Sequence, residues 1–161
     1  GFVITVSHVV EGKTENLAIR TIKGTTVPVE FVKVDTKQDV TLLRLTQALP
    51  GVQPLSLADS SSVRVGQRVL LIASPFGIFP TATAGIVSGR DRQLVGLGTS
   101  CTVCTESVQT DAAVGPGSSG GPLLNEEGKV IGMLARNVTQ VYNLSFAVST
   151  KHIQALIDSS E

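Results

Sequence analysis

Short apolar runs separated by turn residues repeat along most of the chain, up to about residue 148. The runs are rich in Val, Ile, Leu and Thr, which favour extended backbone. A chain of many short strands without intervening helices is typical of a mostly antiparallel β architecture. The pattern predicts strands at 16–22, 27–34, 40–45, 67–73, 81–88, 107–112, 129–135 and 144–149.

Two of these runs differ in their alternation. In 27–34, apolar Val27, Val29 and Phe31 alternate with other residues, as expected of a strand with one face in solvent. The stretch VLLI at 69–72 is apolar at every position, which predicts a central strand buried on both faces.

The C-terminal stretch STKHIQALIDSS has a different period. Ile153, Leu156 and Ile157 recur at intervals of three and four residues after a Ser-Thr pair. This spacing places one apolar stripe on a helix, and Ser or Thr is a favoured residue at the helix start. We therefore predict one helix, at about 150–159, packed on the β structure.

Composition limits the classes of protein that fit. The 161 residues, 42% of them hydrophobic, suffice for one well-buried core but not for two ordinary domains and a linker. Thirteen basic and thirteen acidic residues cancel without a run of like charges, which argues against a nucleic-acid surface. Apolar stretches fall short of the roughly 20 residues of a membrane span. Since the chain opens directly on strand-like sequence, we expect a mature piece or a fragment.

The stretch GPGSSGGP at 115–122 is the strongest chemical signal. Glycines cluster where the backbone takes unusual dihedrals or approaches another group closely, and both needs arise at a nucleophile beside an anion-binding turn. Ser119, directly before Gly-Gly-Pro, is therefore a candidate nucleophile, which would need a neighbouring base and an orienting carboxylate. The alternative is a glycine-rich turn in an ordinary β protein.

The chain has only two histidines from which to choose a base. His8 follows the strand-like stretch FVITVS at 2–7, whereas His152 lies on the predicted helix with no acid near it in sequence and is expected to be a helix-end residue. Asp39 directly precedes the apolar run 40–45 and is the preferred carboxylate, although Asp35 precedes the same run. His8 as a satisfied core histidine and Asp39 as a turn residue remain the alternatives. The order His8, Asp39, Ser119 is that of chymotrypsin-type triads.

The chain resembles the HtrA/Deg (Do-like) group of trypsin-like serine proteases in five blocks that follow in order: TVSHVV, QDVTLLRL, RVLLIASPFGIFPTATAGIVS, VQTDAAVGPGSSGGPLLNEEGKVIGM and LSFAVS. The resemblance implies an all-β fold of two six-stranded antiparallel barrels of the chymotrypsin type, at about 1–58 and 63–148, and a C-terminal helix at about 150–159. Because the family has further strand sequence before its histidine block, we expect the N-terminal barrel to be incomplete. No PDZ domain is expected in this sequence.

The resemblance also assigns roles to residues. It makes His8 the general base, Asp39 its orienting carboxylate and Ser119 the nucleophile, with an oxyanion hole at Gly117, Ser118 and Ser119. The backbone N–H groups of Gly117 and Ser119 would face the developing charge. The family usually has Asn at position 118; Ser118 is expected to preserve the turn with different hydrogen bonds. The expected substrate-binding residues are Ala113, Val114, Ala135, Arg136, Asn137, Leu144, Ser145 and Phe146.

The implied function is that of a serine endopeptidase. It would cleave unfolded or extended polypeptides through an acyl-enzyme, in protein quality control, in the periplasm, outside the cell or in an organelle lumen. Uncharged Ala113 at the expected pocket base favours cleavage after small or medium aliphatic residues. Position 119 is Ser, which argues against a cysteine protease. The alternative is a non-catalytic, chaperone-like or scaffold module that binds unfolded chains in the same groove.

We expect no cofactor, no metal and no nucleic-acid partner. A homo-oligomer, a trimer by resemblance, is a further expectation, although the segment that forms it in the family lies outside this sequence. Cys101 and Cys104 form SCTVCT, which lacks the further ligands of a zinc site and precedes a strand, unlike a thioredoxin-type motif. A local disulfide and two loop thiols remain as alternatives. Two glycine motifs, SPFG at 74–77 and GIVSG at 85–89, are expected to be structural turns.

Overall fold

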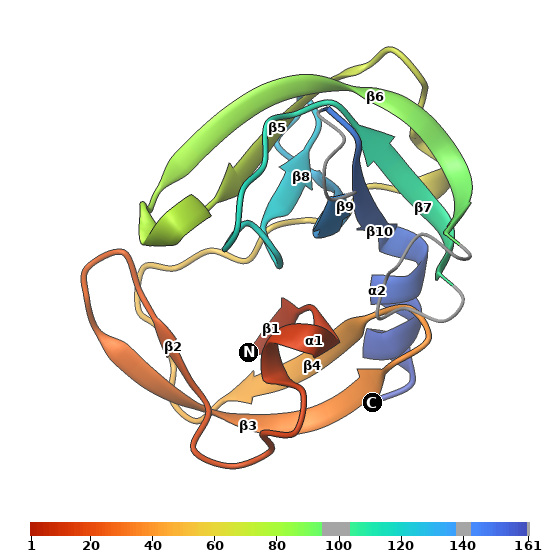
Figure 1. Cartoon of the computed structure of the whole chain (residues 1–161). Coiled ribbons are helices and arrows are strands. Elements are labelled where there is room, and N and C mark those ends of the chain that lie inside the picture. The colour runs from red at the N-terminus through yellow and green to blue at the C-terminus, as the bar shows by residue number, and fades with distance from the viewer. Residues whose placement is uncertain (95–103, 138–142, 161) are drawn as a thin grey trace.

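The computed structural model describes residues 1–94, 104–137 and 143–160, and these form two β units (Figure 1). The N-terminal unit contains β1 (Phe2–Thr5), β2 (Ala18–Arg20), β3 (Thr26–Asp35) and β4 (Val40–Leu45). The C-terminal unit contains β5 (Arg68–Ala73), β6 (Thr81–Leu94), β7 (Cys104–Thr110), β8 (Pro122–Leu124), β9 (Val130–Asn137) and β10 (Ser145–Ser149). The helical elements are α1 (Ser7–Val10), the 3-10 turns η1 (Ser60–Ser62) and η2 (Pro75–Gly77), and the nine-residue α2 (Thr150–Asp158).

The two units differ in closure. The N-terminal strands form a curled sheet in the order β1-β4-β3-β2, whereas the C-terminal strands form a closed barrel in the order β10-β7-β6-β5-β8-β9. Neighbouring strands in both units run antiparallel. The predicted fold of the chymotrypsin type, with an incomplete N-terminal barrel and a C-terminal helix, is therefore confirmed.

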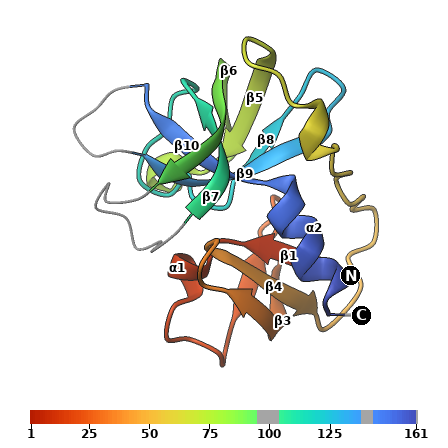
Figure 2. The same cartoon turned by 90° about the vertical axis from the view of Figure 1, so that its right-hand side faces the viewer.

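Helix α2 lies beside both units (Figure 2). Ser149 caps it, because its hydroxyl accepts a hydrogen bond from the Lys151 N–H at 3.3 Å. Ile153 and Leu156, only 2% and 5% exposed, pack in one cluster with apolar residues of the sheet and of the barrel. Burying each such side chain contributes about 1.5–3 kcal/mol relative to leaving it exposed. The predicted apolar stripe therefore stabilises the contact between the two units. No helix in the described ranges is long and apolar enough to span a membrane.

The prediction that 69–72 would be buried on both faces is wrong. Strand β5 is central in that it pairs with both β6 and β8, but Leu70 is 40% exposed while Val69 and Leu71 are 4% and 1% exposed. A closed barrel has one interior, so alternate residues of each strand face inward and outward. An all-apolar run does not distinguish these two environments.

The prediction of a turn at GIVSG is also wrong, whereas SPFG does form the turn η2. Residues 85–89 lie inside the long strand β6. A Cβ at Gly85 would lie 2.5 Å from Asp111 Oδ1 and 2.6 Å from the Ala112 nitrogen. Segment 111–112 approaches the strand so closely that only glycine fits at position 85. Close approach of another backbone, rather than a turn, therefore explains this glycine.

Candidate active site

His8, Asp39 and Ser119 come together from three separate elements. His8 lies in α1, directly after β1, and Asp39 lies in the turn between β3 and β4. Pairing of β1 with β4 sets Thr5 opposite Thr41, so the residues just outside this pair, His8 and Asp39, are also neighbours. Ser119 belongs to the loop that joins β7 to β8, which faces α1 across the two units in Figure 1.

Hydrogen bonds from Ser7 and His8 hold the carboxylate of Asp39. Its Oδ2 lies 2.8 Å from His8 Nδ1, while its Oδ1 accepts from the Ser7 hydroxyl at 2.6 Å and from the His8 backbone N–H at 3.0 Å. The residue is 2% exposed. Burial alone would raise the pKa of Asp39, but the hydrogen bonds from His8 and Ser7 outweigh it, and the pKa lies below its ordinary value of 3.8. The group is therefore a carboxylate at neutral pH.

The second nitrogen of the same ring faces the serine. His8 Nε2 lies 3.2 Å from Ser119 Oγ, and the His8 side chain is 28% exposed. Because a carboxylate accepts at Nδ1, the neutral ring carries its proton there, and the lone pair of Nε2 is left for the Ser119 hydroxyl. The carboxylate, imidazole and hydroxyl form one hydrogen-bonded line that ends at a partly exposed oxygen.

The turn that precedes Ser119 presents free backbone donors. The Pro116 carbonyl accepts from the Phe76 N–H at 2.7 Å, and a trans peptide points its N–H opposite to its C=O, so the Gly117 N–H faces away from Phe76. Within the described part of the chain, no acceptor bonds to the N–H of Gly117 or of Ser119. Two unpaired donors beside a nucleophile are the arrangement that stabilises an oxyanion.

Glycine at position 117 has two structural reasons. Its φ is +94°, in the region that side-chain-bearing residues rarely adopt, and a Cβ there would lie 2.6 Å from the Ser74 carbonyl oxygen. Ser118 completes the turn, since it is 2% exposed and its hydroxyl accepts from the Gly115 N–H at 3.1 Å. Its own N–H donates back to the Gly115 carbonyl at 3.0 Å.

The alternative residues from the sequence have other roles in the structure. Asp35 Oδ1 accepts from the N–H groups of Lys37 and Gln38, at 3.0 and 3.1 Å, and so stabilises the turn before β4. His152 lies on α2, with Nε2 3.1 Å from the Thr105 carbonyl oxygen. An acid is near it after all, because Glu106 Oε2 of β7 lies 3.4 Å from the same nitrogen. A contact across 46 residues leaves no local sequence signal.

The predicted substrate-binding residues lie in the loop between β7 and β8, on β9, and at or just before the start of β10. Ala113 is exposed, and its carbonyl accepts from the Thr83 hydroxyl at 2.8 Å; Val114 packs on the barrel core. Ala135, Ser145 and Phe146 are buried, and Leu144 is half-buried beside Phe146. Arg136 and Asn137 belong to β9, and their side chains lie outside the described part.

Sequence reasoning missed two hydrogen bonds that join the turn carrying Asp39 to β7. The Gln38 amide donates to the Thr105 hydroxyl at 3.2 Å and accepts from the Thr105 N–H at 3.3 Å. Cys104, the preceding residue, is disulfide-bonded, and its predicted partner Cys101 lies outside the described residues. The turn that carries Asp39 is therefore attached to the start of the strand that leads toward Ser119.

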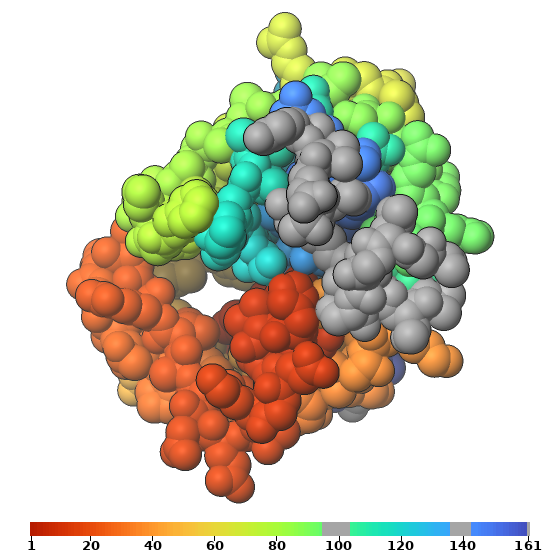
Figure 3. Space-filling view, in the orientation of Figure 1, coloured from red at the N-terminus to blue at the C-terminus, as the bar shows by residue number. Residues whose placement is uncertain are grey.

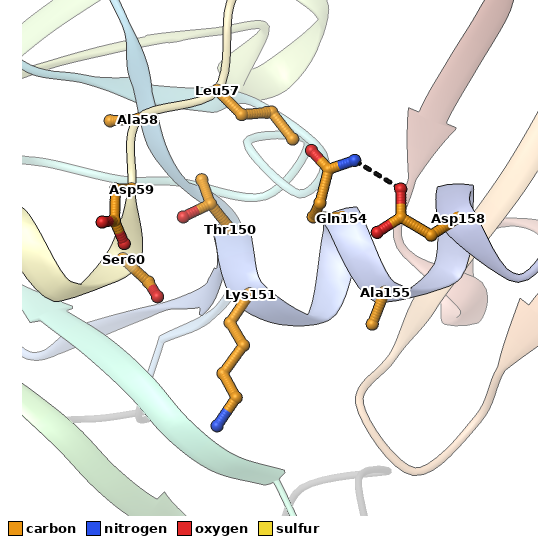
Figure 4. Close-up of a pocket in the computed structure, with 9 residues that line it drawn as sticks. All are labelled: Leu57, Ala58, Asp59, Ser60, Thr150, Lys151, Gln154, Ala155 and Asp158. Atoms are coloured by element: carbon orange, nitrogen blue, oxygen red, sulfur yellow. Dashed lines mark hydrogen bonds between the residues drawn. The ribbon is translucent and has the colours of Figure 1, made fainter.

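A cavity of about 370 Å³ lies elsewhere, between the segment around η1 and helix α2 (Figure 4). None of His8, Asp39 and Ser119 lines it. Among its lining side chains, the Gln154 amide donates to Asp158 at 2.7 Å, whereas the buried Thr150 hydroxyl has no hydrogen-bond partner in the described part of the chain. No group of three His, Cys, Asp or Glu side chains suited to a metal ion occurs among residues 1–94, 104–137 and 143–160.

Comparison with known proteins gives consistent matches. The profile of the trypsin-like peptidase domain matches residues 1–133. "Serine protease Do-like HtrB" of Bacillus subtilis is 36% identical over 162 residues, 98% of this chain and 35% of the relative. "Probable periplasmic serine endoprotease DegP-like" of Halomonas elongata is 39% identical over 151 residues, 92% of this chain and 30% of the relative. The "Serine protease HTRA2, mitochondrial" of Bos taurus is 35% identical and covers 100% of this chain and 34% of the relative.

The solved structure "HtrA-type protease AlgW with decapeptide" superposes with a TM-score of 0.86 at 29% identity, over 99% of this chain and 49% of that one. This chain spans about a third of the length of its curated relatives. Their names place relatives in the periplasm and the mitochondrion, so family members occur in extracytoplasmic or organellar locations. The chain belongs to the trypsin-like peptidase domain family and, within it, is a protease domain of the HtrA/Deg group.

Proposed function

We propose that this chain hydrolyses peptide bonds as a serine endopeptidase, with Ser119 as nucleophile, His8 as general base and Asp39 as orienting carboxylate. The observation that carries the proposal is the continuous line of contacts, 2.8 Å from Asp39 Oδ2 to His8 Nδ1 and 3.2 Å from His8 Nε2 to Ser119 Oγ. Relatives named serine proteases support the same assignment.

In the first half of the reaction, Ser119 Oγ attacks the carbonyl carbon of the scissile bond while its proton passes to His8 Nε2. The adjacent carboxylate of Asp39 stabilises the imidazolium that forms. The N–H groups of Gly117 and Ser119 donate to the oxyanion, and each such donor is worth about 100- to 1,000-fold in rate. His8 then gives its proton to the leaving amine, which departs and leaves an ester on Ser119.

In the second half, water replaces the amine. His8 accepts a proton from this water, whose oxygen attacks the ester, and the same oxyanion donors serve again. Collapse of the second tetrahedral intermediate breaks the ester bond, returns the proton from His8 to Ser119 Oγ and releases the carboxylic acid. The low pKa of Asp39 keeps its charge in place during both halves.

We extend the proposal to the substrate and its setting. An extended or unfolded polypeptide would pair with the backbone of β9 near Ala135 by strand addition. The uncharged side chain of Ala113 at the expected pocket base favours a small or medium aliphatic residue before the scissile bond. Protein quality control outside the cytoplasm or in an organelle, in a homo-oligomer, is the setting that the family suggests.

Labelling by a fluorophosphonate, followed by casein cleavage on the same samples, tests the proposal. The unsubstituted chain should be labelled and active, whereas Ser119→Ala should be neither. Ser56→Ala is the matched control, because this serine is exposed and outside the candidate site; it should behave like the unsubstituted chain. Absence of labelling in the folded, unsubstituted chain would contradict catalysis and favour a module that only binds unfolded polypeptides.

A further inference from the structure

Ser7, the residue directly before His8, contacts both the side chain and the main chain of Asp39. Its hydroxyl donates to Asp39 Oδ1 at 2.6 Å, and its backbone N–H donates to the Asp39 carbonyl at 3.2 Å. Figure 3 shows the N-terminal segment, in red, on the same face of the molecule as the blue-green segment that follows β7. The hydroxyl takes no part in the proton transfers of the proposed reaction.

The backbone of Asp39 has a conformation that needs support. Its φ is +60°, in the left-handed region, although the residue carries a side chain. Aspartate tolerates this region better than most residues, but such a conformation persists only where surrounding contacts hold it. The bonds from Ser7 are contacts of this kind, because one fixes the main chain of Asp39 and the other fixes its carboxylate.

The direction of the carboxylate depends on the donors that each oxygen accepts. Oδ1 accepts from the Ser7 hydroxyl and from the His8 N–H, while Oδ2 lies 2.8 Å from His8 Nδ1. An O–H···O⁻ distance of 2.6 Å is that of a strong, charge-assisted hydrogen bond. Of the two bonds at Oδ1, only the longer one, at 3.0 Å, would remain without the hydroxyl. The Ser7 hydroxyl is therefore the stronger restraint on the oxygen that does not face the ring.

A second serine makes the same type of bond away from the candidate site. The Ser61 hydroxyl donates to Asp59 Oδ2 at 2.7 Å, and the Ser61 N–H donates to Asp59 Oδ1 at 2.8 Å. Both of these residues are exposed, whereas Asp39 is 2% exposed. Water can replace a donor that is lost at an exposed carboxylate, but a buried carboxylate depends on donors of the protein.

We propose that Ser7 is a positioning residue of the candidate active site: it holds Asp39 so that Oδ2 stays directed at His8 Nδ1 while His8 gains and loses its proton. The proposal rests on the proposed function, because it concerns the transfer of a proton between Ser119 and His8. Ser7 does not touch the reacting atoms and acts through Asp39. A carboxylate that is already fixed stabilises the imidazolium without reorganising, so Ser7 should affect kcat rather than KM.

Two substitutions separate the hydroxyl from the backbone bond. Ser7→Ala removes the hydroxyl and keeps the N–H, whereas Ser7→Thr keeps both. For a peptide anilide, kcat of Ser7→Ala should be about tenfold lower, with KM changed by less than about twofold. Ser7→Thr should recover most of kcat, and Ser61→Ala is the matched control that should equal the unsubstituted chain. If kcat of Ser7→Ala stays within about twofold of the unsubstituted chain, or falls no further than that of Ser61→Ala, the proposal is overturned.

The same substitution in an Asp39→Asn background tests whether Ser7 acts through the carboxylate. Adding Ser7→Ala to Asp39→Asn should change kcat by less than about twofold, because the group that the hydroxyl holds is already absent. A loss of about tenfold in both backgrounds would show that Ser7 acts independently of Asp39, and the proposal would fail.

If the unsubstituted chain does not react with a fluorophosphonate, the proposed function fails instead, and the restraint on Asp39 is judged by proton NMR with isotope-labelled histidine. A ring N–H bonded to a fixed, buried carboxylate exchanges slowly with water, so the signal of His8 Nδ1–H should be sharp in the unsubstituted chain and in Ser7→Thr, and broadened in Ser7→Ala. His8→Ala identifies the signal, since His152 is the only other histidine. An equally sharp signal in Ser7→Ala, or no signal in the unsubstituted chain, overturns the proposal.

Discussion

The two β units differ in how their cores are formed and in which candidate catalytic residues they carry. The barrel has a core of its own, formed by residues between Ala58 and Ala147, and its six strands close on themselves. The sheet instead buries Val6, Val40 and Leu42 in a cluster shared with β9, β10 and α2. Among the described strands, β1 and β2 each pair on one edge only. The unit that carries His8 and Asp39 therefore shares part of its core with the unit that carries Ser119.

This difference shows which contacts set the distance between His8, in the sheet unit, and Ser119, in the barrel unit. The His8 and Asp39 pair is fixed within the sheet by β1–β4 pairing and by its own hydrogen bonds. The distance from His8 Nε2 to Ser119 Oγ depends instead on how the sheet sits on the barrel. One shared apolar cluster sets that position, so substitutions within each unit and between them should have distinguishable effects.

The largest effect is expected from removing the base. His8→Ala should lower kcat by about 10⁴- to 10⁶-fold, because the Ser119 hydroxyl then has no acceptor for its proton. His152→Ala is the matched control, since the polar partners of that ring among the described residues, Thr105 and Glu106, belong to β7. Steady-state cleavage of a peptide ester measures both. Equal losses in the two variants would contradict the assignment of the base.

The next effect is on the barrel side of the site. Gly117→Ala should lower kcat by about 100- to 1,000-fold, because a Cβ would collide with the Ser74 carbonyl and reorient the oxyanion donors. Gly128→Ala is the control: it shares a positive φ, +74°, but a Cβ there meets nothing within 4 Å. It should lose some stability and retain kcat. Retention of activity by Gly117→Ala would exclude a role of this turn in binding the oxyanion.

A substitution between the units should affect stability first. Leu156→Ala removes a side chain that is 5% exposed in the shared cluster, and such truncations cost about 2–5 kcal/mol in the free energy of unfolding. Gln154→Ala, on the exposed side of the same helix, should change it by less than about 0.5 kcal/mol. Urea unfolding followed by circular dichroism measures both. If Leu156→Ala leaves the unfolding midpoint unchanged, the units do not depend on this cluster.

The sequence predicted what depends on local pattern. Apolar periodicity predicted the strands and α2, and a glycine cluster at Ser119 predicted the nucleophile. It did not predict β8, because three residues, Pro122–Leu124, are too few to show a period. The exposure of Leu70 depends on barrel closure, which no run of apolar residues reveals.

Contacts between segments far apart in the chain could not be predicted from the sequence either. Two aspartates precede β4, and only the fold shows that Asp35 caps a turn while Asp39 meets His8. A cavity beside Arg20 combines a hairpin of the sheet with a segment some 50 residues later in the barrel. Each part looks like an ordinary loop in the sequence, so neither part alone predicts that the two lie together.

The smallest effect is a pH dependence of stability that belongs to the sheet alone. The pKa of Asp39 is lower in the folded chain than its ordinary value of 3.8, so the charged form contributes its full stabilisation above that value. As the pH falls below 3.8, the unfolded chain takes up the proton first, and the contribution declines until the folded carboxylate is protonated. Urea unfolding at a series of pH values between about 6 and 3 should therefore show a stability advantage over Asp39→Asn that shrinks at the acid end. Parallel curves for the two proteins would mean that the hydrogen bonds from Ser7 and His8 do not favour the charged form, and that the sheet holds Asp39 only by its backbone.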